Sequence, residues 1–534
     1  MRRWRWAALA LLVPFALSAW LVIWGAWLAL WGASNLVLAA PSQSLTLLSR
    51  AVDGAARSAG ILSWAASGWG ALAPALPVLE PVESAGSSLR TASDAGLELA
   101  PILPAALGAE GPKRYLISGL NDAELFGSGG APLQAILFEG DDGSLSTPIS
   151  GSVSAKLNPL NVPYPWDVNA GLPWYSPGAI YPFANSNYHP DFAVSGPNMK
   201  SAWEGLGLPA VDGVVTVDVY AVAAVLDAIG PIESEAYGLV TADNVVRTLL
   251  VDAYRDYPDS EANARRQGLN SQFQSELVDA LKDPRNLIRA TMALWEVIQG
   301  RHIQAWMVDP DLQQIVEDVG AHGELSEGTG DLVGVFSQSG PSKLAIFQER
   351  SIDHDVVVAA DGSAEVTQTA TFTSAVPEDL AGDPNAYRGY LALIYRQRVA
   401  FRIPEAAQDP EVAVLGGGGI VVNSATGPYP DEVGGQVMWQ GQDLRPGDQS
   451  RTVVTYTLPP GTFGSPDDLE YWLDADPQAT VAPTELTVTV TFPSGQARAL
   501  GDERAETRGA QARWTGSLDR PISLRVGNDA ASSG

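Results

Sequence analysis

The feature that most constrains this chain is an uncharged, apolar stretch close to its N-terminus. Arg2, Arg3 and Arg5 precede the stretch, which runs from Trp6 to Ala33. A helix rises about 1.5 Å per residue, so the run exceeds the roughly 20 residues that a bilayer crossing requires. Flanking arginines favour the cytoplasm. We therefore expect a single-pass cell-membrane protein with a cytoplasmic N-terminus and with its C-terminal domains extracellular.

A cleaved signal peptide is the alternative interpretation of the same run. The apolar core of such a peptide is usually about 7–15 residues long and precedes a cleavage site of small residues. The stretch in this chain is about twice that length, and Pro41 directly follows the small residues Ala39 and Ala40. We favour a retained anchor and expect one span, because no other window approaches an uncharged run of that length.

Composition narrows the classes of protein that remain. A chain of 534 residues with 46% hydrophobic content can form two or three domains. Its net charge of −29 argues against nucleic acid as a partner, because phosphates attract Lys and Arg. The chain has no cysteine, so disulfides and thiolate chemistry are excluded. An exported protein without disulfides fits a bacterial cell envelope of the Gram-positive type.

The pattern of the chain predicts four parts. Residues 1–40 form a cytoplasmic stub and a transmembrane anchor, and residues 41–111 form a helical stalk. Residues 112–345 alternate short strands with helices, which is typical of an α/β domain. After residue 345 the helical period disappears, and segments 355–359 and 364–372 read as a hairpin, so residues 346–534 are expected to form an all-β sandwich.

Several short motifs between Lys113 and Lys343 resemble a bacterial family of envelope proteins, the domain of unknown function 4012. The motifs that carry the resemblance are Tyr115-Leu116-Ile117, Asn121-Asp122-Ala123-Glu124-Leu125, Gly129-Gly130, Asn185-Ser186-Asn187, Pro190-Asp191-Phe192, Asp212-Gly213-Val214, Gly230-Pro231 and Thr241-Ala242-Asp243-Asn244-Val245. Their order and spacing match over more than 200 residues. The resemblance implies a membrane-anchored protein without naming a reaction.

Three segments carry a second resemblance: the asparagine region near Asn187, the strand–helix–Gly-Pro run at 211–231, and Arg266-Gln267 near a helix start. They are more distantly similar to the LytR-CpsA-Psr phosphotransferases, and this similarity implies an α/β core of their kind. Those membrane-anchored enzymes transfer glycopolymers from a polyprenyl diphosphate carrier to peptidoglycan, with arginines on the diphosphate and Mg²⁺ held by carboxylates. In the domain of unknown function 4012, an arginine usually follows the Glu-Leu pair. Here that position is Phe126, and a phenyl ring cannot replace a guanidinium group.

Two acidic residues are candidates for a magnesium or polar-ligand site. Asp122 and Glu124 follow a predicted strand, within a segment from Asn121 to Gly130 that we expect to form a glycine-rich loop. Ligands gather at such strand ends in open α/β sheets. The structural alternative is that Asn121 and Asp122 shape a turn while Glu124 is solvated.

A second group of candidates combines arginines with polar loop residues. Arg247, Arg265 and Arg266 could recognise a phosphate or an acidic glycan, or they could form salt bridges with nearby acidic residues. Asn187 and Asp191 follow an aromatic loop and could bind sugar, or they could hold the loop in place. The four histidines show no spacing typical of a metal site.

Two functions remain open at this point. The first is a non-catalytic envelope protein that binds wall polymer or partner proteins, and we favour it because Phe126 stands at the arginine position and no hydrolase motif is present. The second is a phosphotransferase acting on a polyprenyl diphosphate-linked glycopolymer, with magnesium as its metal. Convergence of Arg247, Arg265 or Arg266 with Asp122 or Glu124 at one cleft would favour the enzyme.

Overall fold

The computed structural model describes most of the chain beyond its N-terminal segment. The described ranges are 45–70, 80–141, 144–153, 183–257, 260–281, 283–339, 342–381, 394–415, 420–431, 433–466, 468–500 and 505–529. The expected span from Trp6 to Ala33 lies outside these ranges. Within them, no helix combines the length and the apolar character that a membrane crossing needs.

The first described elements are two long helices that form an antiparallel hairpin. α2 (Leu45–Gly70) and α3 (Glu80–Ala106) approach each other closely through small residues. A Cβ added at Gly60 would lie 2.6 Å from the Ser93 hydroxyl, and one at Gly96 would lie 2.8 Å from the Ala56 Cβ. α3 continues through Pro101 and Pro104, although proline usually interrupts a helix.

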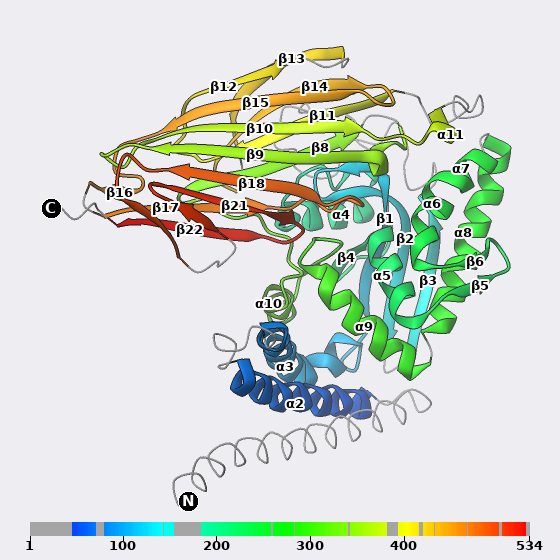
Figure 1. Ribbon diagram of the computed structural model, residues 1–534. Helices are drawn as coiled ribbons and strands as arrows, with labels where there is room; N and C mark the ends of the chain where they lie inside the picture. Colours follow the sequence, from blue (N-terminus) through cyan, green and yellow to red (C-terminus); the bar gives the residue numbers. More distant parts are fainter. Residues whose placement is uncertain are drawn as a thin grey trace, which may run out of the picture.

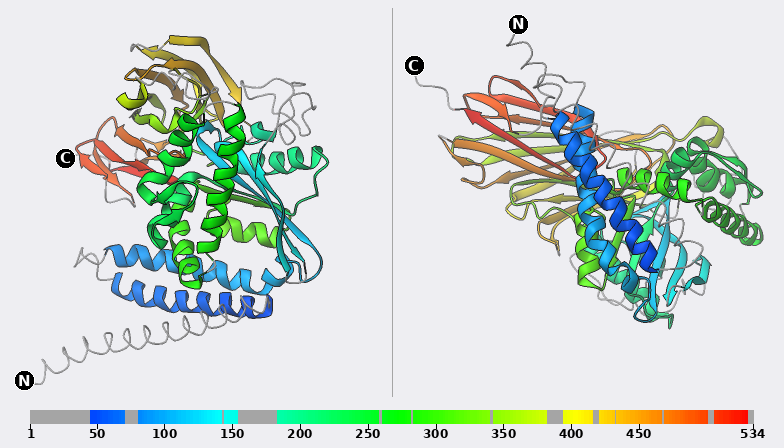
Figure 2. Two further views of the ribbon diagram at one scale, coloured as in Figure 1. Left: turned by 90° about the vertical axis from the view of Figure 1, so that its right-hand side faces the viewer. Right: turned by 90° about the horizontal axis from the view of Figure 1, so that it is seen from below.

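The hairpin does not extend away from the rest of the molecule as a simple stalk would. It lies across the underside of the α/β part, and α3 passes next to α10 (Pro310–Asp318) (Figure 1). When the molecule is seen from below, α2 is the outermost element of that side (Figure 2). The hairpin therefore presents one long face of α2 on the outside.

A five-stranded mixed sheet forms the centre of the α/β part. Its strand order is β3 (Ser144–Ser152), β2 (Gly129–Asp141), β1 (Lys113–Phe126), β4 (Gly213–Val217) and β7 (Ile303–Met307). β1 and β4 run parallel, and the other neighbours run antiparallel. This sheet confirms the α/β class predicted for the region.

The segment expected to be a glycine-rich loop is instead part of the sheet. β1 continues to Phe126, and β2 begins at Gly129, with register shifts after Gly119 and after Asn121. A Cβ at Gly130 would lie 2.4 Å from the backbone carbon of Asn121, so only glycine allows the two strands to approach so closely. The bulges redirect the side chains at the end of β1.

Helices cover both faces of this sheet. The helices of the α/β part are α4 (Phe192–Gly205), α5 (Val219–Ile229), α6 (Ala242–Arg247), α7 (Ala253–Asp256), α8 (Ser260–Ala280), α9 (Pro284–Ile298) and α10, beside the small hairpin of β5 (Ile232–Ser234) and β6 (Gly238–Val240). Several begin where the sequence predicted: the Thr241 side chain accepts from the Asn244 amide, and Asp309 caps α10.

Two stacked sheets form the β-rich part. One sheet has the order β12 (Gln408–Leu415), β15 (Gln449–Leu458), β10 (Ala364–Ser374), β9 (Gln348–Val358), β18 (Thr484–Thr491), β21 (Gln511–Leu518) and β20 (Glu506–Arg508). The other has β13 (Ile420–Pro430), β14 (Gln436–Leu444), β11 (Tyr395–Ile403), β8 (Asp331–Ser339), β17 (Asp468–Asp476), β22 (Ile522–Asp529) and β19 (Gln496–Ala499), with the short β16 (Gly464–Ser465) beside β17. A continuous apolar core fills the space between them.

One boundary differs from the sequence prediction. The α/β part was expected to extend to residue 345, with the sandwich beginning at residue 346. The structure places β8 in the middle of the second sandwich sheet, between β11 and β17. All nine residues of β8 are buried, so their apolar pattern fits either part equally well.

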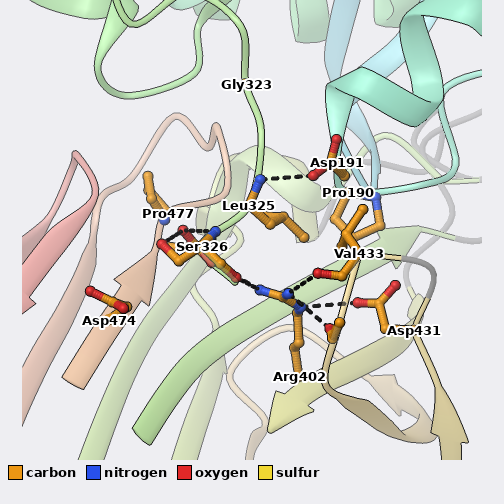
Figure 3. Close-up of polar contacts among 12 residues, drawn as sticks. Pro190, Asp191, Gly323, Leu325, Ser326, Arg402, Asp431, Val433, Asp474 and Pro477 are labelled. Carbon is orange, nitrogen blue, oxygen red and sulfur yellow. Dashed lines mark hydrogen bonds and ion pairs between the residues drawn. The ribbon is translucent and has the colours of Figure 1, made fainter. Parts of the chain in front are cut away.

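A buried polar network joins the two parts. The Arg402 guanidinium on β11 donates to Asp431 at 2.9 Å and lies 3.4 Å from a carboxylate oxygen of Asp476. It also donates to the carbonyl oxygens of Ser326, Val433 and Gly434 (Figure 3). Arg402 is thus held by several partners while remaining fully buried.

A second arginine crosses the same junction. Arg301 donates to the carbonyl oxygens of Pro190 at 2.6 Å and Pro477 at 3.3 Å, and to that of Gly323. Asp191 accepts from the Leu325 amide at 2.8 Å in the same region (Figure 3). Because these contacts join the α/β part to the strands of the sandwich, the two parts share one polar interior.

Candidate functional site

A pocket of about 600 Å³ opens where the end of β1 meets β11. Its lining combines cationic, amide and aromatic side chains from both parts of the molecule. The lining residues are Glu124, Phe126, Ala131, Leu133, Gln134, Val153, Ala184, Asn185, Tyr188, Tyr254, Arg266, Gln267, Asn270, Gln338, Ser339, Lys343, Arg396, Gln397 and Arg398. This volume lies within the range of about 300–1,000 Å³ that is typical of small-ligand sites.

Tyr254 organises one wall of the pocket. Its hydroxyl accepts a hydrogen bond from Asn121 Nδ2 at 3.1 Å. The Arg266 guanidinium carbon lies 3.7 Å from the centre of its ring, and Lys343 Nζ lies 4.8 Å from the same centre. Aromatic faces attract cations, so this ring helps to hold two positive charges in one place.

The local backbone explains how Tyr254 comes to this position. A five-residue π-helical segment, Thr248–Asp252, separates α6 from α7, and Tyr254 follows it directly. A π-turn inserts an extra residue into the helical repeat and changes the direction of the side chains that follow, and such turns are frequent at functional sites. The sequence alone predicted an ordinary helix from Thr241 and did not anticipate this turn.

Glu124 lines the pocket but is already neutralised. Its carboxylate lies 2.6 Å from Lys343 Nζ, and the Lys343 side chain is almost completely buried. Lys343 therefore offsets the charge of Glu124 on the wall where a magnesium ligand was predicted.

The sandwich contributes two further cations. Arg396 and Arg398 alternate along β11 with buried residues, and both line the pocket. Arg396 forms an ion pair with Asp443 at 3.1 Å while its side chain remains 60% exposed. These arginines were not predicted as site residues, although an Arg-x-Arg pair on a strand of an acidic chain was a visible signal.

The charge of the lining is opposite to that of the whole chain. Among the lining residues that the structure describes, Arg266, Lys343, Arg396 and Arg398 are cationic, and Glu124 is the one that carries a carboxylate. The chain as a whole carries a net charge of −29. An acidic protein that gathers cations around a cavity presents a local site for anions.

Asp122 is only two residues from Glu124 in the chain, but it does not line the pocket. It is buried, and its carboxylate accepts from the Val219 amide at 3.3 Å. Burial, together with the neighbouring charge of Asp218, raises the pKa of the Asp122 carboxyl well above its usual value. Such an environment favours the protonated form, whereas a metal ligand must be ionised.

The surroundings of the two carboxylates do not fit the magnesium site considered from the sequence. Glu124 is held by an ammonium group, and Asp122 faces the start of α5. Among the residues that the structure describes, no three His, Cys, Asp or Glu side chains are grouped as metal ligands would be. We derive no chemical step through a metal.

Asn187 and Asp191 serve the fold in this structure. Asn187 donates to the Gly130 carbonyl at 2.9 Å and so holds the start of β2. Asp191 caps α4 by accepting from the Ala193 amide at 2.7 Å. Neither residue lines the pocket, whereas the nearby Asn185 does.

The candidate arginines separate into different environments. Arg266 is 7% exposed and lines the pocket. Arg247 instead forms ion pairs with Asp379 at 2.6 Å and Asp252 at 3.5 Å on the surface. Arg265 is exposed above the Tyr257 ring at 5.5 Å. Of the predicted site residues, the structure brings together Glu124 and Arg266.

The aromatic residue at the expected arginine position is part of the pocket wall. Phe126 packs edge-on against Tyr188, with ring centres 4.6 Å apart, and both line the cavity. The Phe126 carbonyl accepts from Gln478 of the sandwich at 2.7 Å. An apolar surface therefore stands where the sequence comparison led us to look for a guanidinium group.

Comparisons with known proteins add a family to this description. Residues 110–254 match the family model described as "Protein of unknown function (DUF4012)". No curated protein matches the sequence. This matched segment contains Glu124, Phe126 and Tyr254, whereas Arg266 and the sandwich residues lie beyond it.

Several solved structures are similar in part. They include TagV of B. subtilis (13% identity, 40% of this chain and 80% of that chain, TM-score 0.24) and the transcriptional regulator YvhJ of Bacillus subtilis (16%, 39% and 76%, TM-score 0.22). A nutrient-binding protein of Legionella pneumophila is similar at 12% identity, over 37% of this chain and 72% of that chain, with a TM-score of 0.21. The family resemblance first read from short motifs is confirmed between residues 110 and 254, where the chain is similar to the DUF4012 model.

Proposed function

We propose that this protein is a membrane-anchored component of a bacterial envelope whose pocket binds an anionic wall polymer without transforming it. The observation that carries the proposal is the gathering of Arg266, Lys343, Arg396 and Arg398 around one cavity of about 600 Å³. Several fixed cations are needed for such recognition, because one exposed ion pair contributes only about 0–1 kcal/mol.

The remaining lining residues suit a glycan that carries phosphate or carboxylate groups. Tyr188 and Tyr254 offer aromatic rings, while Asn185, Gln267 and Asn270 offer amide groups. Sugar rings stack on aromatic faces, and amides both donate to and accept from hydroxyl groups. A polymer with alternating sugars and anionic groups would use both kinds of contact.

A phosphotransferase acting on a polyprenyl diphosphate-linked glycopolymer is the second candidate. It is favoured by one specific observation: Glu124 and Arg266 line the same cavity. Phe126 at the expected arginine position and the Glu124–Lys343 ion pair support the non-catalytic alternative. The two candidates therefore differ in whether a bound diphosphate is consumed.

Calorimetry with the full-length protein tests the binding site. The probes are a synthetic poly(glycerol phosphate) and geranyl diphosphate, which is a short polyprenyl diphosphate. Arg266→Gln and Arg398→Gln should each weaken binding about tenfold or more, since a hydrogen bond to a charged group contributes about 1.5–3 kcal/mol. Because Arg398 is exposed, its variant preserves the interior even if Arg266→Gln perturbs folding.

Arg247→Gln is the matched control, because Arg247 forms its ion pairs with Asp379 and Asp252 outside the pocket. Equal loss of binding in the Arg247 and Arg398 variants would contradict the assigned site. Product analysis of geranyl diphosphate then separates the candidates: consumption that Arg266→Gln abolishes would support the transferase, and binding without consumption would support the binding protein.

The location of the protein needs its own test. We infer extracellular exposure from the arginine-flanked apolar run between Trp6 and Ala33. Protease treatment of intact cells should cleave the region after residue 34 under conditions that leave cytoplasmic proteins intact. Complete protection of this region, while known surface proteins are cut, would contradict the proposed topology.

A further inference from the structure

One exposed side of α2 carries a narrow stripe of two arginines and a tryptophan. Arg50, Arg57 and Trp64 follow one another at intervals of seven residues, which is close to two helical turns. All three are exposed: Trp64 is 55% accessible, and the Arg57 side chain is 57% accessible. The adjoining side of α2 packs against α3 through Ala56 and Gly60.

The position of this stripe in the molecule is distinctive. α2 is the outermost element on the underside, with the rest of the described molecule above it (Figure 2). Trp64 adds a large, exposed aromatic side chain to the same helix face as the two arginines. Asp53 forms an ion pair with Arg57 at 2.8 Å and offsets part of the positive charge of Arg57. Arg50 is the other cation of the stripe.

The distribution of charge along the chain points in the same direction. Residues 34–79, which follow the predicted span, contain two arginines and one aspartate, without lysine or glutamate. Residues 80–534 contain 27 Lys and Arg but 60 Asp and Glu. An anionic surface would therefore repel most of this protein and attract its N-terminal end.

We propose that the Arg50–Arg57–Trp64 face of α2 lies on the headgroups of an anionic lipid bilayer. Tryptophan favours the membrane interface, and arginine binds lipid phosphates. The proposal rests on the predicted anchor, whose apolar run ends at Ala33, so 11 residues separate it from α2. At about 3.3–3.6 Å per residue, that connection cannot exceed roughly 40 Å.

This orientation gives the helical hairpin a different role from that of a stalk. A stalk would hold the α/β part away from the membrane, whereas a hairpin lying in the membrane plane holds it close. α2 would then form a platform between lipid and the α/β part, with α3 and α10 above it (Figure 1). Substrate or polymer emerging from the same bilayer would be kept near the protein.

Spin labelling of the full-length protein tests this orientation directly. The chain has no cysteine, so Ser67→Cys introduces a single labelling site one turn from Trp64 and leaves the stripe intact. Val357→Cys on β9, where Val357 is 54% exposed, is the matched control. The proteins are reconstituted into bilayers of phosphatidylcholine with phosphatidylglycerol and compared with bilayers of phosphatidylcholine alone.

In the anionic bilayers, we expect the label at position 67 to lose several-fold of its accessibility to a water-soluble relaxation agent, whereas the label at 357 should not change. Arg50→Gln together with Arg57→Gln should restore the accessibility at position 67. The double change of Arg451 and Arg513 to Gln, at exposed positions of the sandwich, should have no effect.

Three results would overturn the proposal. The first is a label at position 67 that stays accessible although the protein floats with the vesicles, which rejects the docking face while keeping the anchor. The second is a protein that does not float at all, which rejects both. The third is protection of position 67 in detergent together with a doubled mass, which assigns the face to a second copy of the chain.

Discussion

Two clusters of arginine lie between the α/β part and the sandwich, and their charges are balanced differently. Arg402 is surrounded by Asp431, Asp476 and three carbonyl oxygens, with its side chain only 1% exposed. In the described part of the chain, the pocket combines four cationic residues with one carboxylate around an open volume of about 600 Å³. Matched buried charges hold a structure in one arrangement, whereas an excess of one sign around a cavity is suited to a ligand.

This difference in charge balance distinguishes arginines that hold the fold from arginines that are available to a ligand. Arg301 and Arg402 are committed to backbone carbonyls and carboxylates within the protein. Arg266 and Arg398 combine their contacts within the protein with a position on the wall of a cavity. Substitutions should therefore change stability at the first cluster and binding at the second.

The largest effect is expected from Arg402→Met. Removing one partner leaves Asp431 and Asp476 buried without their cation, which typically costs about 3–5 kcal/mol. Urea unfolding, followed by tryptophan fluorescence, measures the loss. Arg525→Met is the control, because its ion pair with Glu470 is exposed and should contribute about 0–1 kcal/mol. Similar midpoints for the two variants would remove the distinction between the clusters.

The next effect concerns ligand binding at the pocket. Arg398→Gln should leave the unfolding midpoint nearly unchanged and weaken binding of poly(glycerol phosphate) about tenfold. Binding should also decline with added salt, because ions screen charges of this kind. Calorimetry at two salt concentrations measures both effects. Salt-independent binding would show that the cations of the pocket do not recognise the ligand.

A smaller effect on stability is expected at Asp122. This carboxyl is buried, although it is only two residues from Glu124 of the pocket. Burial and Asp218 raise the Asp122 pKa in the folded state above the unfolded value of about 3.9. The folded protein therefore loses stability as the pH rises from about 4 toward that raised pKa. Asp122→Asn does not ionise, so it should be more stable than the natural protein at pH 8 and should lose this advantage near pH 4.

Thermal unfolding at a series of pH values measures the Asp122 effect. Asp361→Asn provides a control of opposite sign, because hydrogen bonds from Ser363 lower the Asp361 pKa. That variant should show no gain as the pH rises. An Asp122→Asn advantage that is independent of pH would show that Asp122 is ionised in the folded protein and would return it to the candidate ligands.

The smallest effect is expected from Arg396→Gln. This side chain is 60% exposed and paired with Asp443, so its removal should change the free energy of unfolding by less than about 1 kcal/mol. Its contribution to polymer binding should be weaker than that of Arg398 because Asp443 already holds the guanidinium group. If Arg396→Gln lost more stability than Arg402→Met, the arginine of the pocket would be the structural one, contrary to the distinction drawn between the two clusters.

Local structure was largely predictable from the chain. Thr241 and Asp309 cap helices as their side chains suggested, and the hairpin expected from residues 355–359 and 364–372 is confirmed as β9 and β10. Capping and hairpin turns depend on contacts a few residues apart, which a sequence pattern can show. The loop expected between Asn121 and Gly130 was wrong because its polar and glycine residues belong to a bulged strand pair.

The site was predictable only in part, for a related reason. Glu124 and Arg266 were chosen as single residues in polar motifs, and both line the pocket. Lys343 and Arg398 were missed because they come from the segment after β8 and from β11, more than 200 residues after Glu124 in the chain. No spacing rule relates residues at such separations, so their meeting could not be read from local pattern.

The sequence by itself determined the family segment, the α/β and β-rich character of the two parts, and the expectation of an N-terminal anchor. Each of these depends on composition or on short-range periodicity, which the chain carries at every position. Tertiary structure alone decided that β8 belongs to the sandwich, that Asp122 turns inward while Glu124 meets Lys343, and that Arg266 reaches the pocket while Arg247 does not. These outcomes depend on which distant surfaces bury one another, because burial and pairing of charge are decided between elements and not within them.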